Sequence, residues 1–173
     1  DQRKKLLAFD GSFHGRTLLS LQASHSPAKR APFEMKGFEV VYAPFSPWPT
    51  PQEAEPAEPS DLLSLVAKGK IDALVTKYAT GPDRLLAEEV QSLAEVDSQL
   101  ALGEFFAVVI EPIQSEGGDR YATSRFHRAL RVLTRRHDVP LIYDEVQAGF
   151  GLGGTFTWHQ RFGLTTVDGK FDG

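Results

Sequence analysis

Three short stretches of the sequence carry most of the side chains that could do chemistry. Residues 9–17, FDGSFHGRT, place an aromatic ring, a histidine and an arginine around a glycine. Residues 111–119, EPIQSEGGD, and residues 143–151, YDEVQAGFG, add carboxylates and amides. One such residue alone is most often a cap or a surface ion pair, but polar groups that converge from separate elements are typical of a small-molecule pocket.

Each stretch contains or follows the end of an apolar run bounded by turn residues. These runs predict strands at residues 5–9, 38–42, 105–110 and 141–143. They are nearly continuous rather than alternating, which is typical of a parallel sheet covered on both faces. Ligands of such sheets bind beyond the carboxyl ends of the strands. If the strands are parallel, nine side chains share that edge: Phe13, His14, Arg16, Glu111, Gln114, Glu116, Asp144, Glu145 and Gln147.

Helices are predicted between the strands. Residues 124–137 form the clearest one, and Thr123 or Ser124 can cap its start. Its apolar face repeats at i, i+3, i+4 and i+7: Phe126, Ala129, Leu130 and Leu133. We expect its five arginines to form a solvated face: Arg125, Arg128, Arg131, Arg135 and Arg136. With further helices predicted at residues 17–23 and 84–102, the order of elements favours an α/β layer architecture.

One segment interrupts this order. Residues 44–59 contain six prolines and three glutamates, which excludes a regular helix or a central strand. We expect a Pro-rich surface loop, anchored by packing of Trp48 on the body of the protein. A length of 173 residues predicts a single domain.

Composition and charge exclude several classes of function. The net charge is −4 and no long run of Lys and Arg occurs, so binding to nucleic acid is not expected. Cysteine is absent, which excludes thiolate nucleophiles and cysteine-ligated metals, and we predict no metal site. The longest apolar run is too short for a bilayer, and no signal-peptide pattern opens the chain. We expect a cytoplasmic protein with no membrane contact.

A glycine run offers a competing interpretation. Gly149, Gly151 and Gly154 have the G-x-G-x-x-G spacing of a dinucleotide-binding fingerprint, with Asp168 or Asp172 downstream. That mechanism needs the first glycine to follow a strand directly and the last to open an apolar helix. Here DEVQA intervenes and TFTWHQRFG follows, so the spacing favours this site only weakly.

The motifs SFHGRT, EPIQSEGGD and YDEVQAGFG, in this order, resemble the class III (ω-amino acid) aminotransferases. The resemblance covers residues 9–164, and the residues of the three motifs are most similar to those of 4-aminobutyrate and lysine 6-aminotransferases. It implies a fold type I large domain with a mostly parallel sheet, flanking helices and the cofactor pyridoxal 5'-phosphate (PLP). Residues 1–173 would be the central part of that PLP-binding domain.

The resemblance also implies roles for residues at the cofactor. Asp144 would be catalytic and hold the proton on the pyridine nitrogen, because a buried carboxylate stabilises a positive charge beside it. Phe13 would stack on the ring. Gln147 would hydrogen-bond the phenolic oxygen, and His14 would support the cofactor site. Glu111 would also have a supporting role.

For substrates, the resemblance implies an amino acid and a 2-oxo acid. Arg16 would clasp the substrate carboxylate with two parallel hydrogen bonds. Glu116 would be a catalytic and substrate-binding gate that pairs with a distant arginine when an ω-amino acid is bound. Glu145 is expected to be structural. The implied reaction is transamination of a 4-aminobutyrate, lysine or ornithine type donor with 2-oxoglutarate, in a homodimer.

Two essentials of the family are not found in the sequence. The phosphate-binding loop is expected before Asp1 and the Schiff-base lysine after the end of the chain, so we expect an internal fragment. Lys170 lies in the turn-like VDGKFDG and is not assigned that role. The alternatives are a PLP-dependent aminomutase or decarboxylase on the same scaffold, or a non-catalytic fragment.

Overall fold

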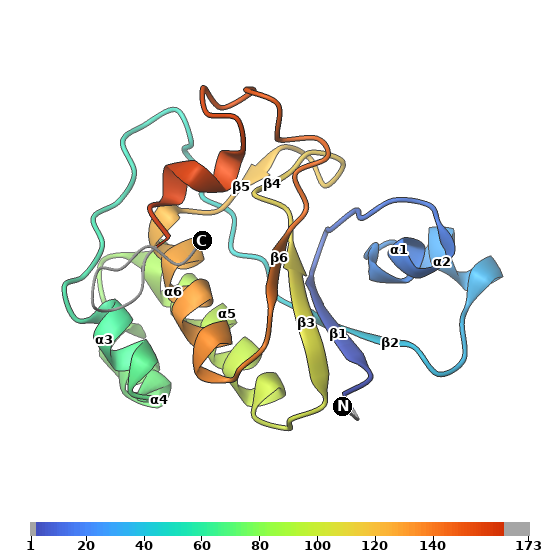
Figure 1. The fold of residues 1–173 in the computed structure, drawn as a ribbon. Helices are drawn as coiled ribbons and strands as arrows, with labels where there is room; N and C mark the ends of the chain where they lie inside the picture. Colours follow the sequence, from blue (N-terminus) through green and yellow to red (C-terminus); the bar gives the residue numbers. More distant parts are fainter. Residues whose placement is uncertain (1–2, 165–173) are drawn as a thin grey trace.

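A computed structural model describes residues 3–164 (Figure 1). Its centre is a parallel sheet in the order β2-β1-β3-β6. The strands are β1 (Lys5–Phe9), β2 (Glu39–Ala43), β3 (Phe105–Ile110) and β6 (Leu141–Tyr143). Three match the predicted ranges, and β2 is shifted by one residue. A small antiparallel pair, β4 (Ile113–Gln114) and β5 (Arg120–Tyr121), follows β3.

Helices lie on both sides of the sheet in Figure 1, which confirms the α/β prediction. The larger group is α3 (Leu62–Ala67), α4 (Ile71–Tyr78), α5 (Arg84–Leu100) and α6 (Ser124–Arg136). The other side carries α1 (Leu18–Ala23), α2 (Pro27–Arg30) and the 3-10 helix η1 (Ala31–Phe33). A second 3-10 helix, η2 (Trp158–Phe162), comes late in the described chain. No helix in the described part of the chain is long and apolar enough to cross a membrane.

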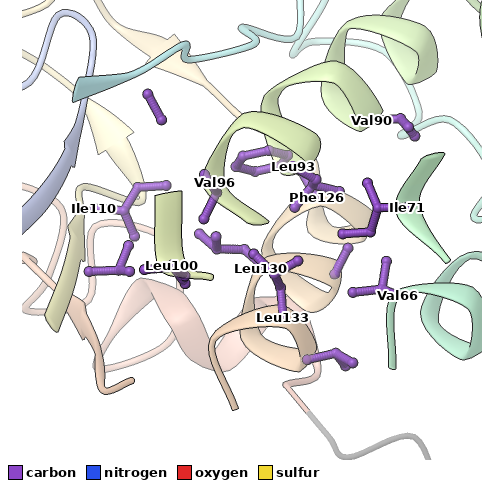
Figure 2. Packing of buried hydrophobic residues seen from close by; sticks show 14 of the residues in the cluster. Val66, Ile71, Val90, Leu93, Val96, Leu100, Ile110, Phe126, Leu130 and Leu133 are labelled. Carbon is purple, nitrogen blue, oxygen red and sulfur yellow. The ribbon is translucent and has the colours of Figure 1, made fainter. Parts of the chain in front are cut away.

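The main core lies between the sheet and the α5–α6 pair. Alternate positions of β1 and β3 point toward it, so Leu7, Phe9 and Ile110 are fully buried there. The ring of Phe9 meets that of Phe126 edge to face, with centroids 6.1 Å apart. Figure 2 shows the helical side chains that complete this core: Val90, Leu93, Val96, Leu100, Phe126, Leu130 and Leu133.

The sequence predicted the long helices and missed the short ones. The helices expected at residues 17–23, 84–102 and 124–137 are confirmed to within two residues at each end. The six residues of α3 and the eight of α4 give too few turns for helical periodicity to stand out. Gly69, with φ of +68°, separates the two helices.

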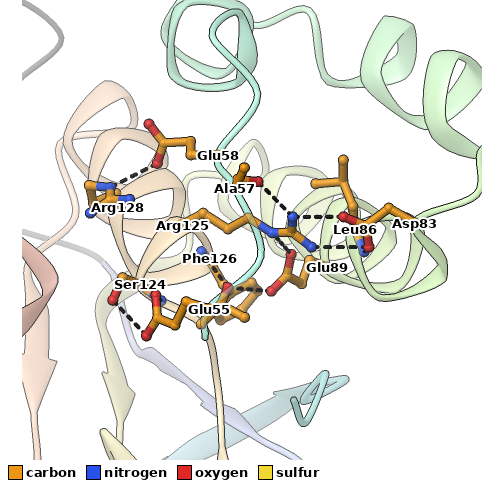
Figure 3. A network of polar contacts seen from close by, with 11 residues as sticks. Glu55, Ala57, Glu58, Asp83, Leu86, Glu89, Ser124, Arg125, Phe126 and Arg128 are labelled. Atoms are coloured by element: carbon orange, nitrogen blue, oxygen red, sulfur yellow. Dashed lines mark hydrogen bonds and ion pairs between the residues drawn. The ribbon is translucent and has the colours of Figure 1, made fainter. Parts of the chain in front are cut away.

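The expectation that α6 carries a solvated arginine face is wrong at Arg125. Its side chain is 1% exposed and donates from Nε to Glu89 Oε2 at 2.6 Å and from Nη1 to Asp83 Oδ2 at 2.8 Å (Figure 3). Thr123 caps α6 by accepting from the N–H of Phe126, and its hydroxyl donates to Glu89. Hydrogen bonding to Arg125 lowers the pKa of Asp83. The apolar spacing could not show that a cation is needed at this position, because its partners lie 36 and 42 residues away.

The start of α6 also holds the Pro-rich segment 44–59, which contains no helix or strand. Ser124 donates to Glu55, Arg125 to the carbonyl of Ala57, and Arg128 to Glu58 (Figure 3). Nearer the start of the segment, the Trp48 N–H donates to the Tyr121 carbonyl at 2.6 Å. Phe45 and Ser46 are buried, and the rest of the segment is exposed or half-buried.

The buried ion pair between Arg125 and Glu89 leads to a testable prediction. Arg125→Met should lower the free energy of unfolding of the complete protein by about 3–5 kcal/mol, because the buried carboxyl group of Glu89 loses its cationic partner. Arg84→Met is the matched control, since Arg84 is 91% exposed in its ion pair with Glu88 and should cost at most about 1 kcal/mol. Urea unfolding measures both. Equal losses in the two variants would contradict the assigned importance of the buried pair.

Candidate active site

Parallel pairing brings the three motifs to one edge of the sheet. Leu7 lies opposite Val108, and Ile110 lies opposite Tyr143, so β1, β3 and β6 end side by side. The segments that follow these strands begin at Asp10, Glu111 and Asp144. Residues more than 130 positions apart in sequence therefore meet at this edge, as the predicted topology requires.

A short contact between His14 and Asp144 joins the first motif to the third. His14 Nδ1 lies 2.8 Å from Asp144 Oδ2, and the histidine side chain is 5% exposed. Nδ1 donates, because a carboxylate only accepts. This hydrogen bond is the main cause that lowers the pKa of Asp144, and the N–H of Val146 donates to its second oxygen at 3.2 Å. Asp144 is thereby held as a carboxylate anion at neutral pH.

His14 leaves one polar atom without a partner. Its Nε2 is buried and makes no hydrogen bond in the structure. A buried ring nitrogen without a partner costs free energy. Among the described residues that line this site, no other side-chain nitrogen or oxygen is buried without a partner.

Glu111 joins the first motif to the second. Its Oε2 accepts the backbone N–H of Phe13 at 2.8 Å, and the residue is 4% exposed. Burial raises the pKa of Glu111 to about 7, while the Phe13 N–H and the neighbouring His14 act in the opposite direction. Glu111 and Asp144, which line the same hollow, therefore have pKa values shifted in opposite directions.

The hollow between these motifs has a volume of about 100 Å³. An aromatic ring, a histidine, two carboxyl groups and an amide surround it. Its lining residues are Phe13, His14, Gly15, Glu111, Ile113, Asp144, Val146 and Gln147. Gly15 has φ of +110°, a conformation that glycine adopts without strain, and it allows the sharp turn after His14.

Four other predicted side chains lie away from the hollow. Arg16 and Glu116 are exposed and do not line it. Gln114 is fully buried and donates to the carbonyl of Asp10. Glu145 accepts hydrogen bonds from His159 and from the N–H of Trp158, in agreement with the structural role expected for it.

Sequence reasoning missed two residues beside the hollow. Ser24 accepts the N–H of His14 at 2.9 Å, and Lys29 Nζ lies 5.1 Å from the centroid of the Phe13 ring. Both follow the first motif in a segment without a motif of its own. No spacing rule connects this serine or this exposed lysine to the turn at Phe13 and His14.

The glycine run does not form a dinucleotide site. Gly151 and Gly154 have φ of +85° and +84° and lie in consecutive turns after β6. These turns lead to the short 3-10 helix η2 rather than opening an α-helix, which phosphate binding at a helix N-terminus would need. The downstream Asp168 and Asp172 lie outside the described residues.

The lining residues fit the ring of pyridoxal phosphate. Phe13 offers an aromatic face, Asp144 an ionised carboxylate for a protonated ring nitrogen, and Gln147 an exposed amide. His14, which also lines the hollow, has one buried ring nitrogen, Nε2, without a hydrogen-bond partner. The lining includes no lysine, and Lys170 lies outside the described residues.

Fold and site together describe an α/β domain with a candidate small-molecule site at the carboxyl edge of a parallel sheet. The chain belongs to the class-III aminotransferase family, whose model matches residues 1–166. The motif-based resemblance is thereby confirmed.

Curated relatives support the same family. The chain is 35% identical over 159 residues to the mitochondrial 4-aminobutyrate aminotransferase of Rattus norvegicus, covering 92% of this chain and 27% of the relative. It is 32% identical over 158 residues to the acetylornithine aminotransferase of Ralstonia nicotianae, covering 91% and 28%. The chain thus spans just over a quarter of the length of these relatives.

Solved structures show the same fold. The lysine aminotransferase of M. tuberculosis superposes with a TM-score of 0.68 at 24% identity, over 95% of this chain and 32% of that one. At this identity the likeness supports the fold alone.

The raised pKa of Glu111 makes a prediction for stability. Its folded pKa of about 7 exceeds the ordinary 4.5, so the folded state binds more protons between these values and loses stability as pH rises through them. Glu111→Gln removes this loss. Relative to the unmodified protein, the variant should gain up to about 3 kcal/mol in free energy of unfolding between pH 4 and pH 8.

Urea unfolding of both proteins across this pH range measures the difference. Subtracting the two curves cancels the groups that titrate in the same way in each. A difference that is constant with pH would show that Glu111 titrates normally.

Proposed function

We propose that the complete protein is a PLP-dependent aminotransferase that transfers the amino group of an ω-amino acid to 2-oxoglutarate. Membership of the class-III family supports this reaction. The single observation that carries the proposal is the His14–Asp144 pair at the wall of a hollow that Phe13 and Gln147 also line. An assay of the complete protein with 2-oxoglutarate and a panel of ω-amino acids tests it.

Asp144 is the proposed electrostatic centre of the site. When bound, pyridoxal phosphate supplies a ring that accepts the electrons released as the substrate C–H bond breaks. Asp144 would hold the proton on the ring nitrogen, which requires the carboxylate to stay ionised. The hydrogen bond from His14 Nδ1 lowers the pKa of Asp144 and orients its carboxylate.

Two other lining residues would orient the ring. Phe13 would pack on one face through an aromatic contact. Gln147 would donate its amide N–H to the phenolic oxygen without adding a charge that competes with Asp144. Both lie at the hollow, and Gln147 is exposed, so its amide can reach a ligand from the open side.

Arg16 and Glu116 are proposed to act on the substrate rather than on the cofactor. Their side chains are exposed, outside the hollow, where a substrate arriving from solvent would first meet the protein. Arg16 would bind a carboxylate through two parallel hydrogen bonds. Glu116 would act as a gate between the two half-reactions. It would pair with a distant arginine when an ω-amino acid is bound and release that arginine for the second substrate.

The donor is proposed to be of the 4-aminobutyrate, lysine or ornithine type. Relatives named 4-aminobutyrate and acetylornithine aminotransferases support this class. The homodimer and the cytoplasmic location stay predictions, and several of the similar curated proteins are named as mitochondrial.

The role of Asp144 predicts a large kinetic effect. Asp144→Asn in the complete protein should lower kcat at least about 100-fold, because a neutral amide cannot stabilise the protonated ring nitrogen. Asp119→Asn, an exposed position in the turn between β4 and β5, is the matched control and should leave kcat unchanged. Turnover of Asp144→Asn within a few-fold of the control would remove Asp144 from this role.

The role of Arg16 predicts an effect on substrate binding. Arg16→Lys should raise KM for carboxylate-bearing donors, since a point charge replaces a planar two-pronged donor. The expected loss is about 1.5–3 kcal/mol, the usual contribution of a charge-assisted hydrogen bond. Arg84→Lys, on an exposed helix surface, is the control, and steady-state kinetics with each donor gives the comparison. An unchanged KM for every donor would make Arg16 structural.

A further inference from the structure

The turn that carries Phe13 is held by the residues that follow β3. The Phe13 N–H donates to Glu111 Oε2 at 2.8 Å. Three residues earlier, the carbonyl of Asp10 accepts from Gln114 Nε2 at 2.9 Å and from Arg120 Nη1 at 3.1 Å. Both ends of the turn are therefore bound by side chains about 100 residues away in sequence.

The two segments approach each other closely. A Cβ at Gly117 would lie 2.6 Å from the carbonyl oxygen of Gly11, and a Cβ at Gly11 would lie 2.8 Å from Gln114 Oε1. The first distance is to backbone, so position 117 has no room for a side chain, and Gly11 has φ of +82°, a conformation that favours glycine. The turn is thus seated directly on the backbone of the second motif.

Within the part of the chain that the structure describes, Glu111 accepts the hydrogen bond of the Phe13 N–H. The next N–H, that of His14, donates to Ser24, and the His14 ring donates to Asp144. The Glu111 contact lies beside the residue whose ring lines the hollow, and Glu111 is 4% exposed, so water cannot easily replace it. Loss of a buried acceptor would leave this N–H unsatisfied.

We propose that Glu111 is a positioning residue, whose carboxyl oxygen holds the Phe13 backbone and thereby sets the Phe13 ring against the cofactor. This inference rests on the proposed function for its effect on cofactor binding. It differs from a proton-carrying role, because the task needs only an acceptor oxygen. Glutamine supplies such an oxygen and leucine does not.

Two variants separate these roles in the complete protein. Glu111→Leu should weaken binding of pyridoxal phosphate about 10-fold or more, the effect of one buried unsatisfied donor. It should also speed hydrogen exchange at the Phe13 amide of the protein without cofactor. Glu111→Gln should stay within about three-fold of the unmodified protein in binding and in exchange. Asp119→Asn, in the nearby turn between β4 and β5, is the control and should change neither.

A second measurement covers the case in which Glu111→Leu does not fold. In ¹⁵N-phenylalanine-labelled protein, the Phe13 amide shift should follow the titration of Glu111, and this step should vanish in Glu111→Gln. His14, Asp144 and Glu116 also face Glu111, and each persists in the variant, so a step that survives belongs to them. A step of unchanged size in Glu111→Gln would show that Glu111 is not responsible for it and would overturn the proposal.

The remaining outcomes are equally decisive. Unchanged exchange and unchanged cofactor affinity in Glu111→Leu would overturn the positioning role. Glu111→Gln as impaired as Glu111→Leu would show that the proton or the charge matters instead, and would also overturn it. Failure of the unmodified protein to bind pyridoxal phosphate would refute the proposed function, while Phe13 exchange would still decide whether Glu111 holds the turn.

Discussion

The candidate site depends on the parallel pairing of β1, β3 and β6. These strands supply no chemistry of their own, but their shared direction places three polar segments at one edge. The segments then bind one another through Glu111 to Phe13, Gln114 to Asp10, and His14 to Asp144. The packing of the sheet and its helices therefore determines where the polar groups meet. Hydrogen bonds between the loops then set the geometry of these groups.

Two neighbouring carboxyl groups in this site have opposite electrostatic environments. A histidine N–H lowers the pKa of Asp144, whereas burial raises that of Glu111 to about 7. Two ionised carboxylates in one small hollow would repel each other, and the raised pKa of Glu111 relieves this repulsion near neutral pH. The negative charge is thus concentrated on the residue proposed to face the ring nitrogen. Such divergence between paired carboxyl groups is a recurring feature of active sites.

The sequence predicted what depends on local pattern and missed what depends on distant partners. Apolar runs gave β1, β3 and β6 residue for residue, and the parallel sheet then placed Phe13, His14 and Asp144 at one edge. The same edge was expected to include Arg16 and Glu116, which lie outside the hollow, because residues in a turn can point in directions that strand order does not specify. The buried Arg125 was missed for a related reason: helical spacing describes one element, and its acidic partners come from another.

The Pro-rich segment is attached to the rest of the protein near both ends, and this limits where insertions and deletions can occur in it. Hydrogen bonds hold it at Trp48 and again from Glu55 to Glu58. Residues 49–53 between these points have no helix or strand and are mostly exposed. Doubling the length of a free loop costs only about 0.6 kcal/mol in closure entropy. Insertions and deletions among homologous sequences should therefore accumulate at 49–53, while the flanking attachments keep a constant distance from α6.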